Sequence, residues 1–277
     1  VGSLMKGLKS PIIVGTPCQI YGIKKYCILQ GIDYSNSLFL GLFCIGTLNY
    51  NFLKYYQWRF GKKNNISKLY YKDKGKDGWP GHTKIIFENG KERFIDRKVR
   101  LGLKKFFQLH RCLFCIDQLN QLADISCGDC YVPGEETFLG QSNIIVRTLK
   151  GDHSLQSLRN KFNFKEINLE LLAESQSISK TKERLVLCNI LTAEHNHILY
   201  PHLQKENRIT EYKVKYEETC RLIKLGQSTN EFNQINKILR EEQLTKKKAR
   251  LIRFIKLLIN PVKLYGKVKE IIKRRLK

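Results

Sequence analysis

Apolar runs and amphipathic segments alternate along the first sixty residues, and their order predicts two βα units. The apolar run at residues 11–14 has the length and composition of a buried parallel strand, and a helical pattern follows at residues 18–30. A second apolar run at residues 38–44 precedes another helical pattern, which extends to Phe60. This part of the chain therefore predicts a parallel sheet flanked by helices.

A cysteine stands where each of these two apolar runs ends. Cys18 falls at the start of the first predicted helix, where the helix dipole and the free amide groups favour an anion such as a thiolate or a phosphate. Cys44 closes the second run. Because parallel strands bring their carboxyl ends to one edge of a sheet, we expect the two thiols to lie close together. On spacing alone, a buried cysteine beside an ordinary turn explains Cys18 equally well.

The pattern changes to short alternating strands after the second unit. Residues 66–73 and 83–95 alternate apolar and polar positions, and Asn89-Gly90 is a strong signal for a two-residue hairpin turn. The loop at residues 74–82 is rich in Gly and Lys and carries Trp79. Such a loop suits contact with phosphates and an aromatic ring, or it is a solvated hairpin loop.

The middle of the chain concentrates the candidate chemistry. Cys112 and Cys115 have the C-x-x-C spacing that lets two thiolates reach one metal centre from a tight turn. Asp117, Asn120 and Asp124 follow at intervals close to one helical turn. This spacing predicts that the three polar side chains share a face leading away from the metal.

Strand and helix signals continue beyond this motif. A short buried strand is predicted at residues 123–126, ending in a sharp turn at Gly128 and Asp129 that places a carboxylate at its tip. Another strand is expected at residues 142–149, followed by a helix at residues 152–162. A strand that ends in a polar turn is where α/β folds usually place a ligand.

The predicted fold class is α/β, with a mixed sheet, βα units at the N-terminus, a hairpin-containing insertion and a mostly helical C-terminal part. We expect an α/β domain at residues 1–165, a mostly helical part of the same domain at 166–240 and a basic helical tail at 241–277. Because the chain starts at Val1 and a strand follows at once, its natural N-terminus is expected to lie further upstream. His195 and His197 read as surface or core residues, since side chains two apart do not share a helix face.

The net charge and the cysteine content predict what the protein binds and where in the cell it is located. The 277 residues carry a formal net charge of +25, and residues 241–277 hold 13 Lys and Arg against 3 Glu. Such an excess predicts attraction to polyanions, and the tail's basic amphipathic pattern fits an anionic membrane surface or a packed terminal helix. Nine irregularly spaced cysteines predict free or metal-bound thiols in a cytoplasmic protein, which the tail would hold at the membrane periphery.

Six ordered motifs support a family resemblance. GTPCQIYGIKKY (15–26), GLFC (41–44), GWPG (78–81), CLFCID (112–117), ADISCGD (123–129) and GQSNIIVRTLKG (140–151) occur in this sequence in that order. The chain thus resembles the coenzyme F420 hydrogenase/dehydrogenase beta-subunit family over residues 1 to about 200. Proteins of this kind carry FAD and a four-iron, four-sulfur (4Fe–4S) cluster, and many bacterial members are associated with polysaccharide biosynthesis.

The resemblance implies a set of ligands for each cofactor. Cys18, Cys44, Cys112 and Cys115 match the four cluster ligands. Cysteines at positions 127 and 130 are unusual for the family and are expected to be extra free thiols. The candidate flavin-binding residues lie in or near these motifs: Gly15, Thr16, Pro17, Gln19, Lys72, Trp79, Asp117, Asn120, Asp124, Ser126, Gly128 and Asp129.

The implied activity is that of an oxidoreductase that passes electrons between a two-electron donor or acceptor at FAD and the 4Fe–4S cluster. Its expected partner is a ferredoxin or another redox subunit, and no specific nucleic acid is expected. Two other classes are open from the residues themselves. One is a zinc-binding basic protein that interacts with nucleic acid, and the other is a cofactorless interaction module of a polysaccharide pathway.

Overall fold

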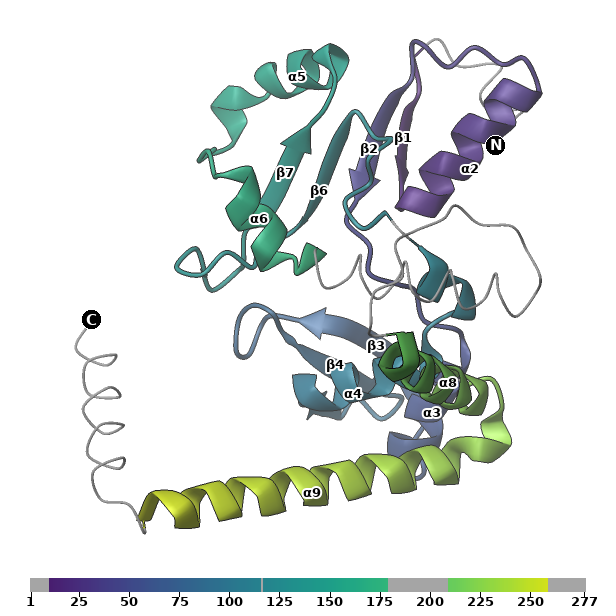
Figure 1. The fold of residues 1–277 in the computed structure, drawn as a ribbon, viewed down its shortest axis with the longest axis vertical. Helices are drawn as coiled ribbons and strands as arrows, with labels where there is room; N and C mark the ends of the chain where they lie inside the picture. The colour runs from purple at the N-terminus through teal and green to yellow at the C-terminus, as the bar shows by residue number, and fades with distance from the viewer. Residues whose placement is uncertain (1–9, 116, 179–208, 259–277) are drawn as a thin grey trace. The chain divides into compact units, whose positions relative to one another are not determined.

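A computed structural model describes residues 10–115, 117–178 and 209–258 of the chain (Figure 1). The chain divides into two compact units, Val1–Gln227 and Ser228–Lys277. The first unit contains both sheets and every candidate site residue. The predicted boundaries near residues 165 and 240 stay a prediction.

The first sheet of unit 1 carries the chemistry-bearing motifs. Its strands follow the order β1-β2-β6-β7, in which β1, β2 and β6 run parallel and β7 pairs antiparallel with β6. Gly41 sits between Gly15 and Ser126 in the register. The carboxyl ends of three parallel strands therefore meet at one edge. The strands are β1 (Ile12–Gly15), β2 (Leu38–Leu42), β6 (Ile125–Asp129) and β7 (Ser142–Val146).

Helix α2 (Pro17–Leu29) connects β1 to β2 and covers one face of this sheet. Its start is well specified, because Pro17 occupies the first turn and Thr16 N donates to Gln19 Oε1 at 2.9 Å. Buried Ile20 packs with Phe39 and Ala123 in a small core. The helix is thereby fixed with Cys18 in its first turn, at the edge where the strands end.

The second sheet of unit 1 is antiparallel, in the order β3-β4-β5. Its hairpin closes at Asn89-Gly90, where Gly90 has φ 77° and its N–H donates to Phe87 O at 2.9 Å. Helices α3 and α4 pack against each other through Phe52 and Phe107, whose ring centroids lie 5.9 Å apart, and Phe52 also packs on Tyr71 of the sheet at 5.6 Å. The elements are β3 (Ile66–Asp73), β4 (His82–Phe87), β5 (Glu92–Ile95), α3 (Asn51–Phe60) and α4 (Arg97–Phe107).

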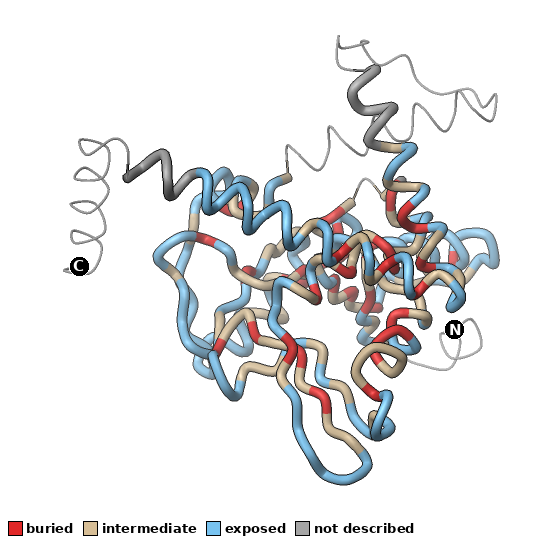
Figure 2. The backbone as a smooth tube through the Cα atoms, turned by 90° about the horizontal axis from the view of Figure 1, so that it is seen from below, coloured by how far each residue is buried: buried red, intermediate tan, exposed pale blue. Residues whose placement is uncertain are grey.

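The remaining elements of unit 1 are short helices and the longer helix α8. Figure 2 shows that buried positions gather in the interior, whereas loops and turns are mostly exposed. Helix α8 packs on α4, and the tight turn that ends it is anchored because Asn51 Nδ2 donates to Gly226 O at 3.2 Å. A Cβ at Gly226 would lie 1.9 Å from Phe106 O, so glycine is required there. These elements are the 3₁₀ helices η1 (His110–Phe114) and η2 (Arg159–Lys161), with α5 (Leu149–Gln156), α6 (Leu169–Ser175) and α8 (Ile209–Leu225).

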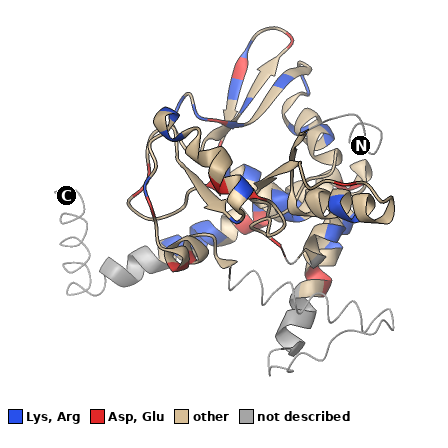
Figure 3. Ribbon diagram, turned by 90° about the horizontal axis from the view of Figure 1, so that it is seen from above, with Lys and Arg blue, Asp and Glu red and all other residues tan. Residues whose placement is uncertain are grey.

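The described part of unit 2 holds η3 (Thr229–Glu231) and the long helix α9 (Phe232–Leu258). Phe232, Ile235 and Leu239 are buried, whereas residues 244–252 are exposed. Lys and Arg positions colour parts of the α9 ribbon blue in Figure 3. None of the described helices is both long and apolar enough to cross a bilayer.

The predicted fold class is confirmed, including the βα units, the hairpin and the helical C-terminal part. Three local predictions were wrong. Gly128 and Asp129 do not form a turn, because they pair with Asn143 and Ser142 inside the ladder between β6 and β7. The strand begins at Ile125 rather than at residue 123.

The second wrong prediction is the shared helical face of Asp117, Asn120 and Asp124. These residues lie in an irregular loop, where Asn120 adopts φ 60° and so interrupts any helix. The third concerns the helix expected at residues 152–162, since α5 ends at Gln156. His195 and His197, and the tail beyond Leu258, lie outside the described residues.

Candidate functional site

Four cysteines from three separate segments line one cavity of about 750 Å³. Cys18 lies in the first turn of α2, and Cys44 follows the end of β2. Cys112 lies in η1, and Cys115 is the residue that ends it. The expectation that Cys18 and Cys44 share a sheet edge thus agrees with the described geometry, and the C-x-x-C pair faces the same space.

Backbone hydrogen bonds hold the cysteine-bearing loops against one another. The N–H of Cys44 donates to Gln118 O at 2.9 Å, which joins the end of β2 to the loop after the C-x-x-C pair. The N–H of Thr47 donates to Cys112 Sγ at 3.4 Å, and Leu109 N–H donates to Thr47 O at 2.9 Å. Thr47, in the segment after β2, is therefore hydrogen-bonded both to η1 and to the residue before it. The cavity wall does not depend on side-chain packing alone.

The thiols of the cavity are electrostatically linked. Burial raises the pKa of Cys115, and the negative charges that Cys44, Asp117 and Cys18 carry when ionised raise it further, against a lowering contribution from its hydrogen bond to Asp117 O. Several thiolates so close together therefore repel one another unless a cation is bound between them. This is the electrostatic condition under which a metal centre displaces protons from its ligands.

The described residues include no group of three or more His, Cys, Asp or Glu side chains gathered closely enough to hold a metal ion. The four thiols share a cavity without converging on one point. A single zinc ion needs four donors around one centre, whereas each iron of a 4Fe–4S cluster takes one thiolate. A soft, four-thiol donor set spread around a cavity therefore fits a cluster better than a single ion.

The rest of the cavity wall was not predicted from the sequence. Three basic residues come from α4 and η1, namely Lys104, Lys105 and Arg111. Gln118 and Gln176 are polar neighbours, joined because Gln118 Nε2 donates to Gln176 O at 3.1 Å. The adjacent Lys pair at positions 104 and 105 was the only local signal for the basic residues, and such pairs are common on solvated surfaces.

Two of the candidate flavin residues, Asn120 and Asp124, are buried connectors between strands. Asn120 Nδ2 donates to Gly15 O at 2.9 Å, and Gly41 leaves room for this side chain, since a Cβ there would lie 2.5 Å from it. Asp124 accepts from Phe39 N–H at 2.8 Å through one oxygen and from Thr148 Oγ1 at 2.7 Å through the other. Both residues therefore hold the ends of neighbouring segments together.

Several other candidates also have structural partners. Ser126 Oγ accepts from Arg147 Nη1 at 2.6 Å, and Gly128 leaves room for Phe43, whose ring would lie 2.4 Å from a Cβ. Thr16 and Gln19 satisfy each other at the start of α2. Among the twelve candidates, Pro17 alone is in the set of residues that line the cysteine cavity.

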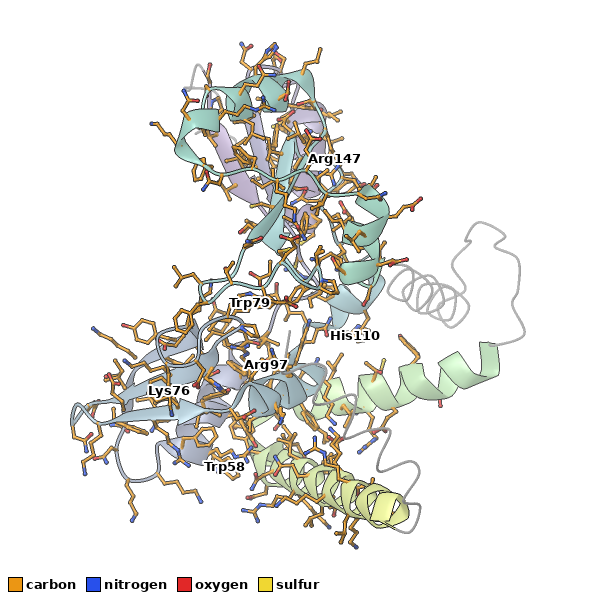
Figure 4. The ribbon with its side chains drawn as sticks, turned by 90° about the vertical axis from the view of Figure 1, so that its left-hand side faces the viewer. Trp58, Lys76, Trp79, Arg97, His110 and Arg147 are labelled. Carbon is orange, nitrogen blue, oxygen red and sulfur yellow. The ribbon has the colours of Figure 1, made fainter. Side chains whose placement is uncertain are left out.

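A second group of candidates surrounds Trp79. Lys72 Nζ lies 2.5 Å from Asp129 Oδ2, and Tyr131 OH donates to the same oxygen at 3.3 Å. The rings of Trp79 and Tyr131 have centroids 5.1 Å apart. In Figure 4, Arg147 lies beside the four-stranded sheet and Trp79 lies below it, toward the three-stranded sheet. Because Tyr131 also lines the cysteine cavity, this group borders that site.

Four buried polar atoms in this region have no hydrogen-bond partner. They are Trp79 Nε1, Asp117 Oδ1, Gln118 Oε1 and Asn120 Oδ1. An unpaired buried polar atom costs about 1–3 kcal/mol, so a group that comes to pair with it binds favourably. Of these four residues, Gln118 lines the cysteine cavity and the other three do not. Three of the four belong to the loop that follows the C-x-x-C pair.

Comparisons with known proteins agree with the motifs. A family model for the C terminus of the coenzyme F420 hydrogenase/dehydrogenase beta subunit matches residues 8–170. The coenzyme F420-dependent sulfite reductase of Methanocaldococcus jannaschii is 27% identical over 180 residues, which is 59% of this chain and 26% of that protein. The coenzyme F420 hydrogenase subunit beta of Methanococcus voltae is 29% identical over 145 residues, or 50% of this chain and 46% of that protein.

A solved structure shows a weaker likeness. A chain of the F420-reducing NiFe hydrogenase complex from Methanosarcina barkeri aligns with a TM-score of 0.44 and 20% identity, covering 64% of this chain and 60% of that one. This chain thus spans less than half the length of the two curated relatives it matches. The family model, which covers more than half of the chain, places it in the coenzyme F420 hydrogenase/dehydrogenase beta-subunit family.

Proposed function

We propose that this protein is an iron–sulfur flavoprotein oxidoreductase in which Cys18, Cys44, Cys112 and Cys115 hold a 4Fe–4S cluster. The observation that carries the proposal is that these four residues, taken from three segments, line one cavity in a member of this family. The raised pKa of Cys115, with burial as its largest cause, adds support. Such a thiol gains most from a bound metal centre, whose positive charge stabilises the thiolate.

FAD is proposed as the second cofactor, and the pattern of unpaired atoms narrows its contacts. Trp79, Asp117 and Asn120 each keep a buried polar atom without a partner and so retain hydrogen-bonding capacity. Asp124, Ser126, Thr16 and Gln19 use theirs within the protein. We therefore assign flavin binding to Trp79 and Asp117 together with Lys72. Fully buried Asn120, which holds Gly15 O, is assigned to structural support with the other four.

When bound, the flavin supplies two-electron chemistry and the cluster one-electron transfer. The protein's residues would hold the two groups near each other. Leu101 and Tyr131 contribute apolar surface to the cavity, and the Lys72–Asp129 ion pair fixes the polar side of the Trp79 group. A ferredoxin or another redox subunit is the proposed electron-transfer partner.

The proposal extends to location through α9. Residues 246–248 and Arg250 are exposed, and the neighbouring side chains of Leu251 and Ile252 are 60% and 54% exposed. A helix with cations beside apolar side chains binds anionic lipid surfaces, at about 1 kcal/mol per Lys or Arg near the surface. We propose peripheral contact with the cytoplasmic face of a membrane, where surface polysaccharide precursors are assembled.

Membrane contact is tested by co-sedimentation with vesicles that contain anionic phosphatidylglycerol or only neutral phosphatidylcholine. The full chain is expected to bind the anionic vesicles in low salt. The triple variant Lys246→Glu, Lys247→Glu and Lys248→Glu is expected to lose most of this binding. Equal binding to both vesicle types rules out the electrostatic part of the proposal.

The oxidoreductase proposal is tested by purifying the full chain without oxygen. It should be brown-yellow, release FAD on acid treatment, and contain about four irons and four acid-labile sulfides per chain. Its flavin and cluster absorption should bleach when dithionite is added. A colourless protein with one zinc per chain would overturn the proposal.

A further inference from the structure

One buried side chain contacts the ends of both strands that lead to Cys18 and Cys44. Asn120, in the loop after the C-x-x-C pair, donates from Nδ2 to the carbonyl oxygen of Gly15, the last residue of β1, at 2.9 Å. The same nitrogen donates to the carbonyl oxygen of Leu42, the last residue of β2, at 3.4 Å. Cys18 and Cys44 follow these strand ends within three residues. A single amide group therefore links the three segments that carry the four thiols.

The strand beside Asn120 has room for this side chain. Gly41 of β2 carries no Cβ, and one placed there would lie 2.5 Å from Asn120 Cγ and 2.7 Å from Ala123 Cβ. Asn120 is 0% exposed, and its backbone adopts φ 60°, a conformation that asparagine tolerates better than most residues. The amide reaches the strand ends because a glycine on β2 and a left-handed residue in the loop both make room for it.

Asn120 occupies this position at a cost to stability. Its Oδ1 atom is buried without a hydrogen-bond partner, and a left-handed backbone is unfavourable for residues other than glycine. A side chain that only filled space would need no polar atoms. Because local costs of this kind gather at functional sites, the two bonds at the ends of β1 and β2 indicate a role in the site that these ends build.

The other bonds of this loop hold Cys44 more firmly than Cys18. Gln118 O accepts from the N–H of Cys44 at 2.9 Å, so Cys44 stays bonded to the loop without the Asn120 amide. Lys24 Nζ donates to a carbonyl oxygen of the loop at 2.6 Å, which attaches α2, but Lys24 lies beyond the first turn that contains Cys18. Loss of the Asn120 amide should therefore loosen Cys18 more than Cys44.

We propose that Asn120 is a positioning residue of the cysteine site, whose amide sets the separation of Cys18 from Cys115. It acts through the backbone of β1, β2 and its own loop. The inference rests on the proposed function only for the identity of the group that the thiols hold. Cys115 interacts electrostatically with Cys18 and Cys44 when they are ionised, so these thiols lie close enough for their separation to be probed chemically.

The test compares variants of the anaerobic full-length holoprotein. Asn120→Asp keeps the shape of the side chain but replaces the donor by an acceptor, so iron should pass to a ferrous chelator about tenfold faster than from the unaltered protein. The EPR signal of the reduced cluster should also change its shape. Asn51→Asp is the matched control, because its amide likewise donates to backbone carbonyls, at 2.7 and 3.2 Å, but does not line the cavity. It should release iron at the unaltered rate.

A second readout needs no cluster. Dibromobimane becomes fluorescent when it joins two neighbouring thiols, and mass spectrometry identifies the pair. After chelation of iron, the unaltered full chain should yield a Cys18–Cys115 product. Asn120→Asp should lose most of this product while keeping more of the Cys44–Cys115 product. Absence of the Cys18 product from the unaltered chain, or an equal loss in Asn51→Asp, overturns the inference.

Gly41→Ala tests the same contact independently and keeps the inference testable if Asn120→Asp does not fold. Its Cβ would displace the Asn120 amide and should also speed iron release, whereas Gly22→Ala on α2 is the control because a Cβ there meets open space. Unchanged iron release and cross-linking in both Asn120→Asp and Gly41→Ala overturn the inference and leave the proposed function intact. If the protein takes up no iron yet the variants lose the Cys18–Cys115 product, the proposed function fails and this inference stands.

Discussion

The cysteine motifs and the polar motifs of this chain behave differently once the chain is folded. The four cysteines lie in three distant segments, yet their side chains line a single cavity. The polar residues interleaved with them, such as Asn120, Asp124 and Ser126, form bonds within the protein that join strand ends. A motif therefore contains both the residues of a site and the residues that hold the site's walls, and only their hydrogen-bond partners separate the two.

The largest expected effect is the loss of the cluster when one of the four cysteines is replaced. Cys44→Ser or Cys112→Ser should abolish the 4Fe–4S cluster, because a serine oxygen is a poor replacement for a soft thiolate ligand. Iron content and visible absorption after anaerobic reconstitution measure the loss. Cys127→Ser is the matched control, since this thiol lies on β6 outside the cavity wall. A full iron complement in the Cys44 variant would remove that residue from the ligand set.

The next largest effect tests whether the buried polar residue Asp124 stabilises the fold and takes no part in flavin binding. Asp124→Ala removes two buried hydrogen bonds and leaves the Phe39 amide unpaired, so the free energy of unfolding should fall by about 3 kcal/mol. Urea denaturation measures the change. The flavin content per folded molecule should stay within experimental error of the unaltered protein. A stable variant that has lost its flavin would instead place Asp124 in the cofactor site.

A comparison of substitutions at two glycines measures how tightly the Trp79 ring is packed. Gly140 and Gly134 both have positive φ, 77° and 87°, but a Cβ at Gly140 would lie 2.4 Å from the Trp79 ring, whereas one at Gly134 would meet open space. Gly134→Ala should cost about 1 kcal/mol from backbone strain alone. Gly140→Ala should cost about 1–3 kcal/mol more, because the indole must move. Thermal unfolding of the two variants gives the difference, and equal costs would mean that the indole shifts freely.

The smallest expected effect on stability comes from the ion pair between Lys72 and Asp129. Their side chains are 41% and 34% exposed, so Lys72→Ala should change the free energy of unfolding by no more than about 1 kcal/mol. If Lys72 contacts the flavin as proposed, the same variant should release FAD several-fold more easily on dilution. Asp129→Asn is the companion variant, because it weakens the ion pair while leaving Lys72 in place. Unchanged FAD retention in the Lys72 variant would remove it from the flavin site.

Apolar periodicity predicted most of the fold because each strand run is short, apolar and bounded by a turn residue. Residues 11–14 and 38–44 became β1 and β2, and Asn89-Gly90 closed the hairpin as expected. The pattern failed at Gly128 and Asp129, where the local preference for a turn yields to pairing with β7. Sequence spacing does not report pairing with a strand that comes later in the chain.

The candidate site divides in the same way. The rule that parallel strands share an edge was enough to bring Cys18 and Cys44 together. The roles of Asn120 and Asp124 could not be predicted, because they depend on long-range partners such as Gly15 O and Phe39 N. Lys105, Arg111 and Gln118 were missed because they belong to the site only through the positions of α4, η1 and the loop after the C-x-x-C pair, respectively. Their residue types are ordinary on any basic protein surface.

The central claim is that four cysteines act as one site, and differential alkylation tests it most directly. The anaerobic full chain is treated with iodoacetamide before and after iron is removed by a chelator, and the labelled cysteines are identified by mass spectrometry. Cys18 is the sharpest reporter because it is exposed and should react quickly unless a metal centre holds it. The account predicts that Cys18, Cys44, Cys112 and Cys115 are protected together and become reactive together. Rapid labelling of Cys18 in the iron-loaded protein, with the other three protected, would contradict it.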